Sequence, residues 1–216
     1  MCCPVLCCEK PIHGGVITLK RLHLDQENYT QVKGAMIATL QTGDVVAAPT
    51  ETVYGLLTLW RNEQGRERIF ELKERSQEKE LQMLAPDPNK AIQFGVLQDQ
   101  RLEKLSRAFW PGPLTVVVKA EGGTTVGLRC PDNAFLMDVL KDLQEPIAAT
   151  SANRSGRPPA CTADDAVAGL HGEPSLLVDG GEVSGQPSTV VSLLNDQPQL
   201  LREGPISLDA IVHVVW

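Results

Sequence analysis

Several stretches of the sequence combine hydroxyl, amide and cationic side chains at the point where an apolar run ends. The clearest is AATSANRSGRPPA at residues 148–160, in which Ser151, Asn153 and Ser155 alternate with small residues. Gly156 permits a positive φ, so this backbone can come close to a ligand. A surface turn rich in Ser and Asn has the same pattern, and the pattern by itself favours neither interpretation.

Hydroxyl groups also adjoin two other apolar runs. Thr50 and Tyr54 follow Pro49 in APTETVYGLL, and Ser188 precedes the run TVV in GQPSTVV. Side chains just past the ends of strands are well placed to bind a ligand in an α/β protein. The alternative for Thr50 is an ordinary turn between a strand and a helix.

Four cationic residues suggest an anionic ligand. Lys73 and Arg75 lie two positions apart in LKERSQEKEL, Arg129 lies in GLRCP, and Arg202 lies in LLREG. Lysine supplies a point charge and arginine a planar fork, and together they suit phosphates and carboxylates. Lys73 and Arg75 would diverge on a regular helix, so they share a pocket only if the helix ends there. A solvated, charged helix end is the alternative.

The sequence lacks the common catalytic motifs. It contains no GxxxxGK[ST], GxGxxG, HExxH or GxSxG, its histidines are isolated, and its carboxylates show no metal-binding spacing. Catalysis would therefore rest on positioning and on neutralising phosphate charge, and not on a side-chain nucleophile.

Alternating helices and strands would position these loops. Apolar periodicity and turn residues predict helices over residues 25–42, 66–75, 102–110, 133–143 and 162–172. Strands are predicted over 45–48, 81–86, 114–120, 124–130, 145–150, 175–181, 188–194 and 199–204, and residues 207–215 fit either a helix or a strand. The last third is rich in strands, which indicates a mixed sheet in an α/β protein.

Composition narrows the class of protein. A chain of 216 residues suits one α/β domain, or at most two small ones. A net charge of −7 argues against a surface built mainly for nucleic acid. No apolar run is long enough to cross a bilayer and the start is not a typical signal peptide, so we expect a cytoplasmic protein without a membrane segment.

The cysteines are unevenly distributed. Cys2, Cys3, Cys7 and Cys8 crowd the start, whereas Cys130 and Cys161 stand alone. Neither a disulfide framework nor a zinc site fits this spacing. We expect residues 1–14 to form a mobile tail with free thiols whose role is open, and residues 15–216 to form a single domain.

Taken together, the stretches resemble the YrdC-type threonylcarbamoyl-AMP synthase family in its short, single-domain form. The matching pieces occur in the family's order over about residues 26–206: APTETVYGLL, Lys73-Glu74-Arg75, FWPGPLTVVV, GLRCPDNAF, ATSANRSGRPP, PSTVV and LLREG. The resemblance implies an α/β fold, a twisted open mixed sheet with flanking helices and a concave, positively lined central cavity.

The resemblance also implies an activity, that of a nucleotidyltransferase. L-Threonine, bicarbonate and ATP would condense to threonylcarbamoyl-AMP with release of pyrophosphate. The product would serve threonylcarbamoylation of adenosine 37 in tRNA through a downstream tRNA-modifying transferase complex. Mg²⁺ is expected to arrive on the ATP phosphates with no metal ligands from the protein, and weak tRNA binding is a further expectation.

Site residues follow from the family's motifs position by position. The ATP-binding set implied is Lys73, Arg75, Gln77, Thr125, Ser151, Asn153 and Arg202, with Lys73 and Arg75 acting on the phosphates as the catalytic pair. The L-threonine set implied is Thr50, Tyr54, Gln82, Arg129 and Ser188, with the Arg129 fork holding the carboxylate bidentately. Lys73 and Arg75 are expected on the wall opposite Ser151 and Asn153.

One segment departs from the family pattern. After Arg75 the chain reads Ser76 to Leu81, SQEKEL, and Glu80 stands where the family has a proline, which adds negative charge near the expected phosphate site. Two alternatives therefore stay open. One is a non-catalytic paralogue that binds RNA or nucleotide, and the other is an enzyme that transfers a carbamoyl group to another substrate.

Overall fold

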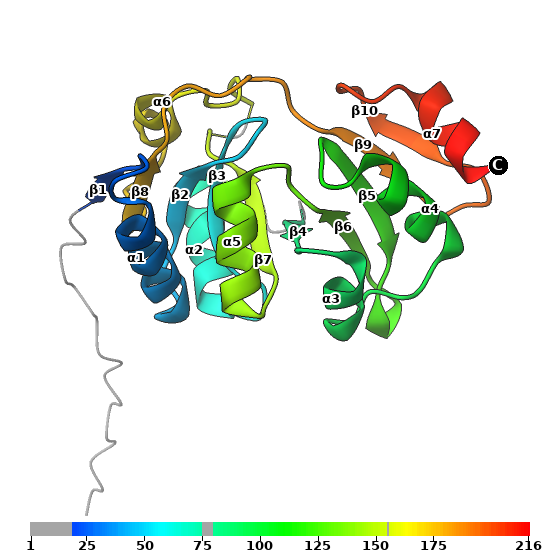
Figure 1. The fold of residues 1–216 in the computed structure, drawn as a ribbon, viewed down its shortest axis with the longest axis horizontal. Coiled ribbons are helices and arrows are strands. Elements are labelled where there is room, and N and C mark those ends of the chain that lie inside the picture. Colours follow the sequence, from blue (N-terminus) through cyan, green and yellow to red (C-terminus); the bar gives the residue numbers. More distant parts are fainter. Residues whose placement is uncertain (1–18, 75–79, 155) are drawn as a thin grey trace, which may run out of the picture.

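The computed structural model describes residues 19–74, 80–154 and 156–216, and these residues build one mixed sheet (Figure 1). Its ten strands lie in the order β1-β8-β2-β3-β7-β4-β6-β5-β9-β10. The strands are β1 (Lys20–His23), β2 (Val46–Pro49), β3 (Tyr54–Leu59), β4 (Gln82–Leu84), β5 (Leu114–Lys119), β6 (Thr125–Arg129), β7 (Ile147–Ser151), β8 (Leu176–Asp179), β9 (Thr189–Ser192) and β10 (Gln199–Arg202).

The sheet has two halves that meet at a short strand. The first half comprises β1, β8, β2, β3 and β7, and the second comprises β4, β6, β5, β9 and β10; they lie on the left and right of Figure 1. The halves join where β4 pairs antiparallel to β7, with Gln82 opposite Ala149. Residues 180–188 connect β8 with β9 and so run from one half to the other (Figure 1).

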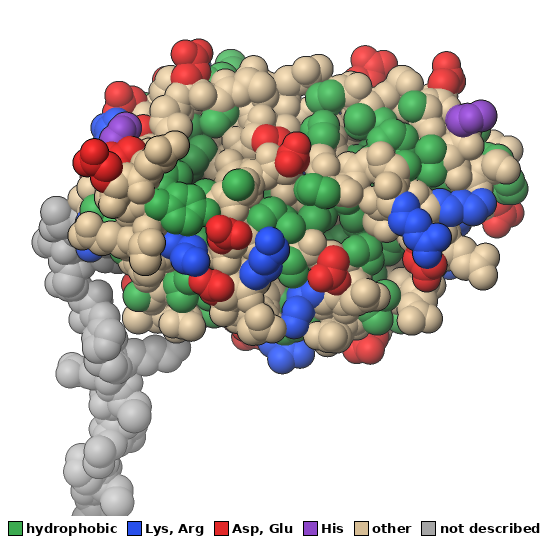
Figure 2. All heavy atoms as spheres, in the orientation of Figure 1, with side chains coloured by type: hydrophobic (Ala, Val, Ile, Leu, Met, Phe, Trp, Pro, Cys, Tyr) green, Lys and Arg blue, Asp and Glu red, His purple; other side chains and the backbone are tan. Residues whose placement is uncertain are grey.

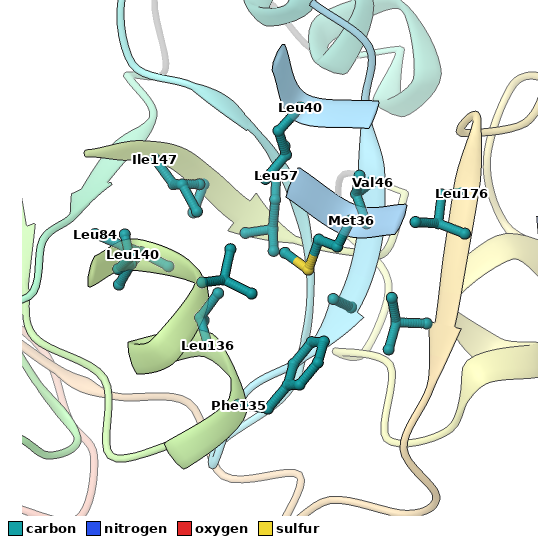
Figure 3. Packing of buried hydrophobic residues seen from close by; sticks show 14 of the residues in the cluster. Met36, Leu40, Val46, Leu57, Leu84, Phe135, Leu136, Leu140, Ile147 and Leu176 are labelled. Atoms are coloured by element: carbon teal, nitrogen blue, oxygen red, sulfur yellow. The ribbon is translucent and has the colours of Figure 1, made fainter. Parts of the chain in front are cut away.

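Helices cover both halves. They are α1 (Tyr29–Gln41), α2 (Glu63–Lys73), α3 (Pro88–Gln93), α4 (Gln100–Phe109), α5 (Ala134–Leu143), α6 (Ala163–Ala168) and α7 (Leu208–Val215), with a short 3₁₀ turn at Glu121–Gly123. In the first half, α1 and α5 pack on one face, where Met36, Leu57 and Leu136 meet in the core of Figure 3. Helices α2 and α6 pack on the opposite face, in a second apolar cluster that contains Leu56. Leu56 and Leu57 are consecutive in β3, so their side chains point to opposite faces of the sheet. Helices α3, α4 and α7 share the core of the second half.

Helix α2 leads directly to the candidate site. It begins at an Asn62 side chain that accepts a hydrogen bond from the amide of Gly65, which satisfies one amide at the helix start. It ends at Glu74, which adopts a left-handed conformation with φ of 48°. A residue with a Cβ atom pays about 1 kcal/mol for that conformation, so the turn must be held by its surroundings.

The structure confirms the mixed sheet and most of the expected elements, with three additions and several shifted boundaries. Strands β1 and β3 and helix α3 were not predicted, and the sequence analysis places no strand or helix between residues 48 and 66. The helix expected over 162–172 ends at Ala168, and residues 207–215 are helical. The expected tail at 1–14 lies outside the described residues.

Within the described part of the chain, no helix is long and apolar enough to cross a bilayer. Cys130 and Cys161 are both free thiols.

Candidate active site

A cavity of about 360 Å³ opens where the two halves of the sheet meet. Both halves contribute to its walls. The first half supplies Thr52, Val53, Ser151 and Pro159, and the second supplies Gln82, Thr115, Arg129, Ser188 and Arg202. Of the sequence-predicted residues, Gln82, Arg129, Ser151, Ser188 and Arg202 therefore converge on one cavity although five separate strands or loops carry them.

The wall from the second half is a chain of side-chain hydrogen bonds. Arg202 donates from Nε and Nη2 to the carbonyl of Ser188, at 3.0 and 2.8 Å, and from Nη2 to Ser188 Oγ at 3.0 Å. Ser188 Oγ lies 2.9 Å from Thr115 Oγ1, which donates to Gln82 Oε1 at 3.2 Å. Burial, with the nearby charge of Arg129, lowers the pKa of Arg202. Arg202 is bonded to neutral groups of Ser188, so its charge makes the cavity attractive to an anion, whereas the charge of Arg129 is balanced by Glu51.

Arg129 at the end of β6 is 3% exposed and firmly held. Nη2 forms an ion pair with the Glu51 carboxylate, Nη1 and Nη2 each donate to Thr52 Oγ1 at 3.1 Å, and Nε donates to the carbonyl of Gly112 at 3.3 Å. These bonds engage four of the five guanidinium N–H groups. In this geometry Arg129 does not present the free fork that bidentate binding of a substrate carboxylate requires.

The sequence analysis missed Glu51, Thr52 and Thr115. Glu51 Oε2 is buried and has no hydrogen-bond partner among the described residues, while its other oxygen pairs with Arg129. Glu51 was visible inside PTETV, but the pair joins residues 78 positions apart. Only the general rule that a buried arginine needs a carboxylate could have pointed to it.

Thr50 holds the turn that carries Glu51 and does not line the cavity. Thr50 Oγ1 donates to the carbonyl of Val53 at 2.8 Å and accepts from the amide of Thr52 at 3.1 Å. It also lies 2.9 Å from Thr52 Oγ1. Thr50 therefore affects the site indirectly: its hydroxyl positions Thr52, and Thr52 lines the cavity.

The expectation that Tyr54 lines the same cavity is wrong for this structure. Its side chain is fully buried on the α2 and α6 face of the sheet. The hydroxyl donates to the carbonyl of Gly181 at 2.7 Å and accepts from the amide of Gly180 at 3.2 Å. The physical reason is strand alternation: Tyr54 is the first residue of β3, so its side chain points away from the face of its neighbours Val53 and Gly55.

The wall from the first half is fixed through the main chain. Lys73 is 2% exposed, and its Nζ donates to the carbonyls of Ser151 and Asn153. Lys73 therefore lies on the same side as these residues and not on the opposite wall. The Asn153 amide donates to the carbonyls of Arg157 at 2.7 Å and Arg154 at 3.0 Å, so this side chain shapes the loop and does not line the cavity.

Of the remaining predicted residues, Thr125 lines an adjoining cavity and not the one described above. Thr125 Oγ1 donates to Glu80 Oε2 at 3.3 Å, and Glu80 lines both the main cavity and an adjoining one of about 300 Å³ that contains Thr125. Glu80 thus places a carboxylate at the boundary between two hollows. Arg75 and Gln77 lie outside the described residues.

The outer surface carries both signs of charge. Acidic and basic side chains are intermixed over the face shown in Figure 2. The arginines that gather at the cavity, Arg129 and Arg202, therefore differ in setting from the scattered charges outside.

Known proteins resemble this chain along most of its length. The family model Sua5–YciO–YrdC, described as telomere recombination, matches residues 38–204. A threonylcarbamoyl-AMP synthase of Bacillus subtilis is 34% identical, over 82% of this chain and 55% of its own length, and one of Vibrio campbellii is 29% identical over 82% and 100%. A crystal structure of Pyrococcus abyssi Sua5 complexed with L-threonine superposes with a TM-score of 0.81 at 31% identity, covering 91% of this chain and 60% of that one. The chain thus spans about half the length of the Bacillus relative and the full length of the Vibrio one.

Proposed function

The chain belongs to the Sua5–YciO–YrdC family, and on that premise we propose that it makes threonylcarbamoyl-AMP from L-threonine, bicarbonate and ATP. The observation that carries the proposal is the pair of guanidinium groups, Arg129 and Arg202, at one cavity between the halves of the sheet. All three substrates are anionic at some group, so bringing them together requires fixed positive charge.

The chemistry divides into two steps. The amine of threonine adds to bicarbonate with loss of water, which gives a carbamate. A carbamate oxygen then attacks the α-phosphorus of ATP, and pyrophosphate leaves with the electrons of the broken P–O bond. The protein supplies orientation and charge in both steps, in line with a site that offers no side-chain nucleophile.

The residues divide between the substrates. Arg129 and Ser188 are assigned to threonine. Arg129 contributes the one N–H that its bonds to Glu51, Thr52 and Gly112 leave over, or releases Glu51 to use its fork. Arg202 and Ser151 are assigned to the nucleotide. The relative crystallised with L-threonine supports an amino acid in this cavity.

A magnesium ion fits this site only as a companion of ATP. No three His, Cys, Asp or Glu side chains gather as a metal site in the part of the chain that the structure describes. Mg²⁺ commonly binds through substrate phosphates with one or two carboxylates, and Glu80 is a carboxylate on the cavity wall. When bound, the ion would neutralise the charge of the departing pyrophosphate.

The proposal includes a cytoplasmic location for the protein. Its product would pass there to a downstream tRNA-modifying transferase complex. Intermixed surface charge and a net charge of −7 favour this hand-over of a small product above tight binding of tRNA by the chain itself.

Release of pyrophosphate from ATP tests the proposal. We expect release that requires both threonine and bicarbonate. Arg202→Lys should raise the KM for a substrate about tenfold or more, because lysine cannot reproduce the fork that holds Ser188. Arg101→Lys is the matched control, since Arg101 pairs with Asp99 and the carbonyl of Leu193 outside this cavity.

Other outcomes identify the alternatives. Retention of RNA without ATP and without turnover would support a binding paralogue. Turnover with carbamoyl phosphate in place of threonine and bicarbonate would support carbamoyl transfer. Pyrophosphate release that ignores threonine would contradict the proposed reaction.

A further inference from the structure

Two consecutive residues at the end of α2 reach the loop after β7 from different sides. Lys73 is buried and its Nζ donates to the carbonyls of Ser151 and Asn153. The next residue, Glu74, turns outward and its Oε2 forms an ion pair with Arg154 Nη2. The segment 151–154, which carries the cavity residue Ser151, is thus bound along its inner and outer edges by one helix end.

The left-handed turn at Glu74 makes this double contact. A regular helical residue after Lys73 would project about 100° away around the helix axis, whereas φ of 48° and ψ of 46° at Glu74 end the helix there. Glycine is the residue that this conformation favours. A glutamate is less suited than glycine to this backbone conformation, but its carboxylate provides the ion pair with Arg154.

A third segment closes around the same point. His171, in the turn after α6, donates its amide to the carbonyl of Leu72 at 2.7 Å, and its Nδ1 lies 4.0 Å from Glu74 Oε1. A Cβ atom on Gly169 would lie 3.8 Å from the Cβ of Arg154. The turn after α6 thus packs beside the ion pair and limits where the Arg154 side chain can go.

We propose that Glu74 and Arg154 are positioning residues that hold segment 151–154 in the conformation that binds the nucleotide. This inference rests on the proposed function for its effect on ATP. It does not rest on stability, because the side chains are 44% and 54% exposed and exposed ion pairs add little to the free energy of unfolding. Without the pair, the segment would keep Lys73, the bond from the Ala152 amide to the Tyr54 carbonyl at 2.7 Å and the bonds of the Asn153 side chain, but no ion pair among the described residues would hold its outer edge at Arg154.

Glu74→Gly separates the ion pair from the backbone turn. Glycine keeps or improves the left-handed helix end while the carboxylate is lost, so the variant should fold normally. We expect amide hydrogen exchange at residues 152–154 to accelerate about threefold to fivefold, the upper part of the range for an exposed ion pair. The difference should shrink in 1 M salt, which screens an exposed pair.

The matched control is one turn earlier on the same helix. Glu71 and Arg68 form an exposed ion pair at 2.9 Å that does not touch segment 151–154. Glu71→Gln should leave exchange at 152–154 unchanged. The charge swap Glu74→Arg with Arg154→Glu should restore protection, which loss of an unrelated contact would not allow.

Kinetics give the functional readout. In Glu74→Gly the KM for ATP should rise about threefold to fivefold while the KM for threonine and kcat stay near the wild-type values. Equal exchange and equal KM for ATP in Glu74→Gly and wild type would overturn the inference. If wild type releases no pyrophosphate, the proposed function fails, and exchange at 152–154 still decides whether Glu74 holds the segment.

Discussion

The two walls of the cavity are built in different ways. The first-half wall is held through its main chain, because Lys73 binds the carbonyls of Ser151 and Asn153. The second-half wall is a network of side chains in which Arg202, Ser188 and Thr115 bond one another.

The different construction of the two walls implies that one sets the shape of the cavity and the other supplies its chemical groups. A wall fixed through backbone carbonyls tolerates changes in its outward side chains, and here a buried cation adds to the main-chain bond between Ala152 and Tyr54. A wall made of side-chain bonds presents functional groups directly to a ligand, and each member orients the next. Binding groups should therefore concentrate on the second-half wall, and the first-half wall should set the outline of the cavity.

The largest effect is expected from Arg129→Met on the side-chain wall. The substitution leaves the Glu51 carboxylate without its cation, and Arg129 is 3% exposed. We expect a loss of about 3–4 kcal/mol in the free energy of unfolding, typical of a broken buried ion pair. Urea denaturation measures it.

Two variants sharpen this result. Adding Glu51→Gln to Arg129→Met should recover more than half of the loss, because the orphaned charge is removed. Arg107→Met breaks only the exposed 3.8 Å pair with Glu103 and should change stability by less than about 0.5 kcal/mol. If Arg129→Met resembled Arg107→Met, the side-chain wall would not depend on this pair.

Lys73→Met should have the next largest effect and should act on the other wall. The substitution removes the ammonium from the carbonyls of Ser151 and Asn153 while the apolar stem is retained, and the Ser151 carbonyl keeps the Asn153 amide as a donor at 3.0 Å. We expect a loss of about 2–3 kcal/mol, as for buried hydrogen bonds to a charged group.

Exchange rates tell which wall has loosened. Amides of segment 151–154 should exchange faster in Lys73→Met, while those of β9 and β10 should be unaffected. Lys141→Met, on an exposed lysine 3.8 Å from Asp138, is the control. Equal loosening of both walls would show that they are not independent.

The smallest effect concerns pH and the residue that follows Arg129. Burial raises the pKa of the Cys130 thiol from 9.0 to about 11. The unfolded chain loses this proton near pH 9 and the folded chain keeps it until about pH 11, so stability falls as the pH rises through that window. Relative to Cys130→Ala, wild type should lose about 2 kcal/mol between pH 9 and 11, measured by urea denaturation. An identical pH profile for both proteins would contradict the raised pKa and would mean that water reaches the Cys130 thiol just past the end of β6.

The sequence predicts the α/β class, the mixed sheet and five residues that meet at the cavity. The class, the sheet and the polar residues at strand ends depend on local signals: apolar periodicity, and glycine and proline at turns. Gln82 and the binding roles of all five residues come from the resemblance to the family's motifs. The strand over residues 54–59 was not predicted because Tyr54 and Gly55 follow a polar stretch, although the strand is buried almost throughout. A strand buried on both faces shows no alternation of polar and apolar residues.

The orientation of individual side chains was harder to predict. The direction of Tyr54 follows from the residue at which β3 starts, and element boundaries are the weakest part of a sequence prediction. The direction of Lys73 depends on how α2 packs beside the loop after β7, whose carbonyls it binds, and the local sequence carries no signal of that packing. The pair of Arg129 with Glu51 depends on which strands become neighbours, and periodicity carries no such information.

The three-residue strand β4 joins the two halves of the sheet, and the chain passes from one half to the other several times. This path determines when each half can be completed during synthesis on the ribosome. The chain moves from α2 to β4, returns from β6 to α5, and crosses again from β8 to β9. Strand β1 pairs with β8, which is synthesised more than 150 residues later, as Lys20 opposite Leu176 shows. The first half therefore stays incomplete until most of the chain has emerged, and Arg202 arrives later still. Premature release of the nascent chain should leave exposed strand edges and no working cavity, which makes this topology dependent on complete synthesis.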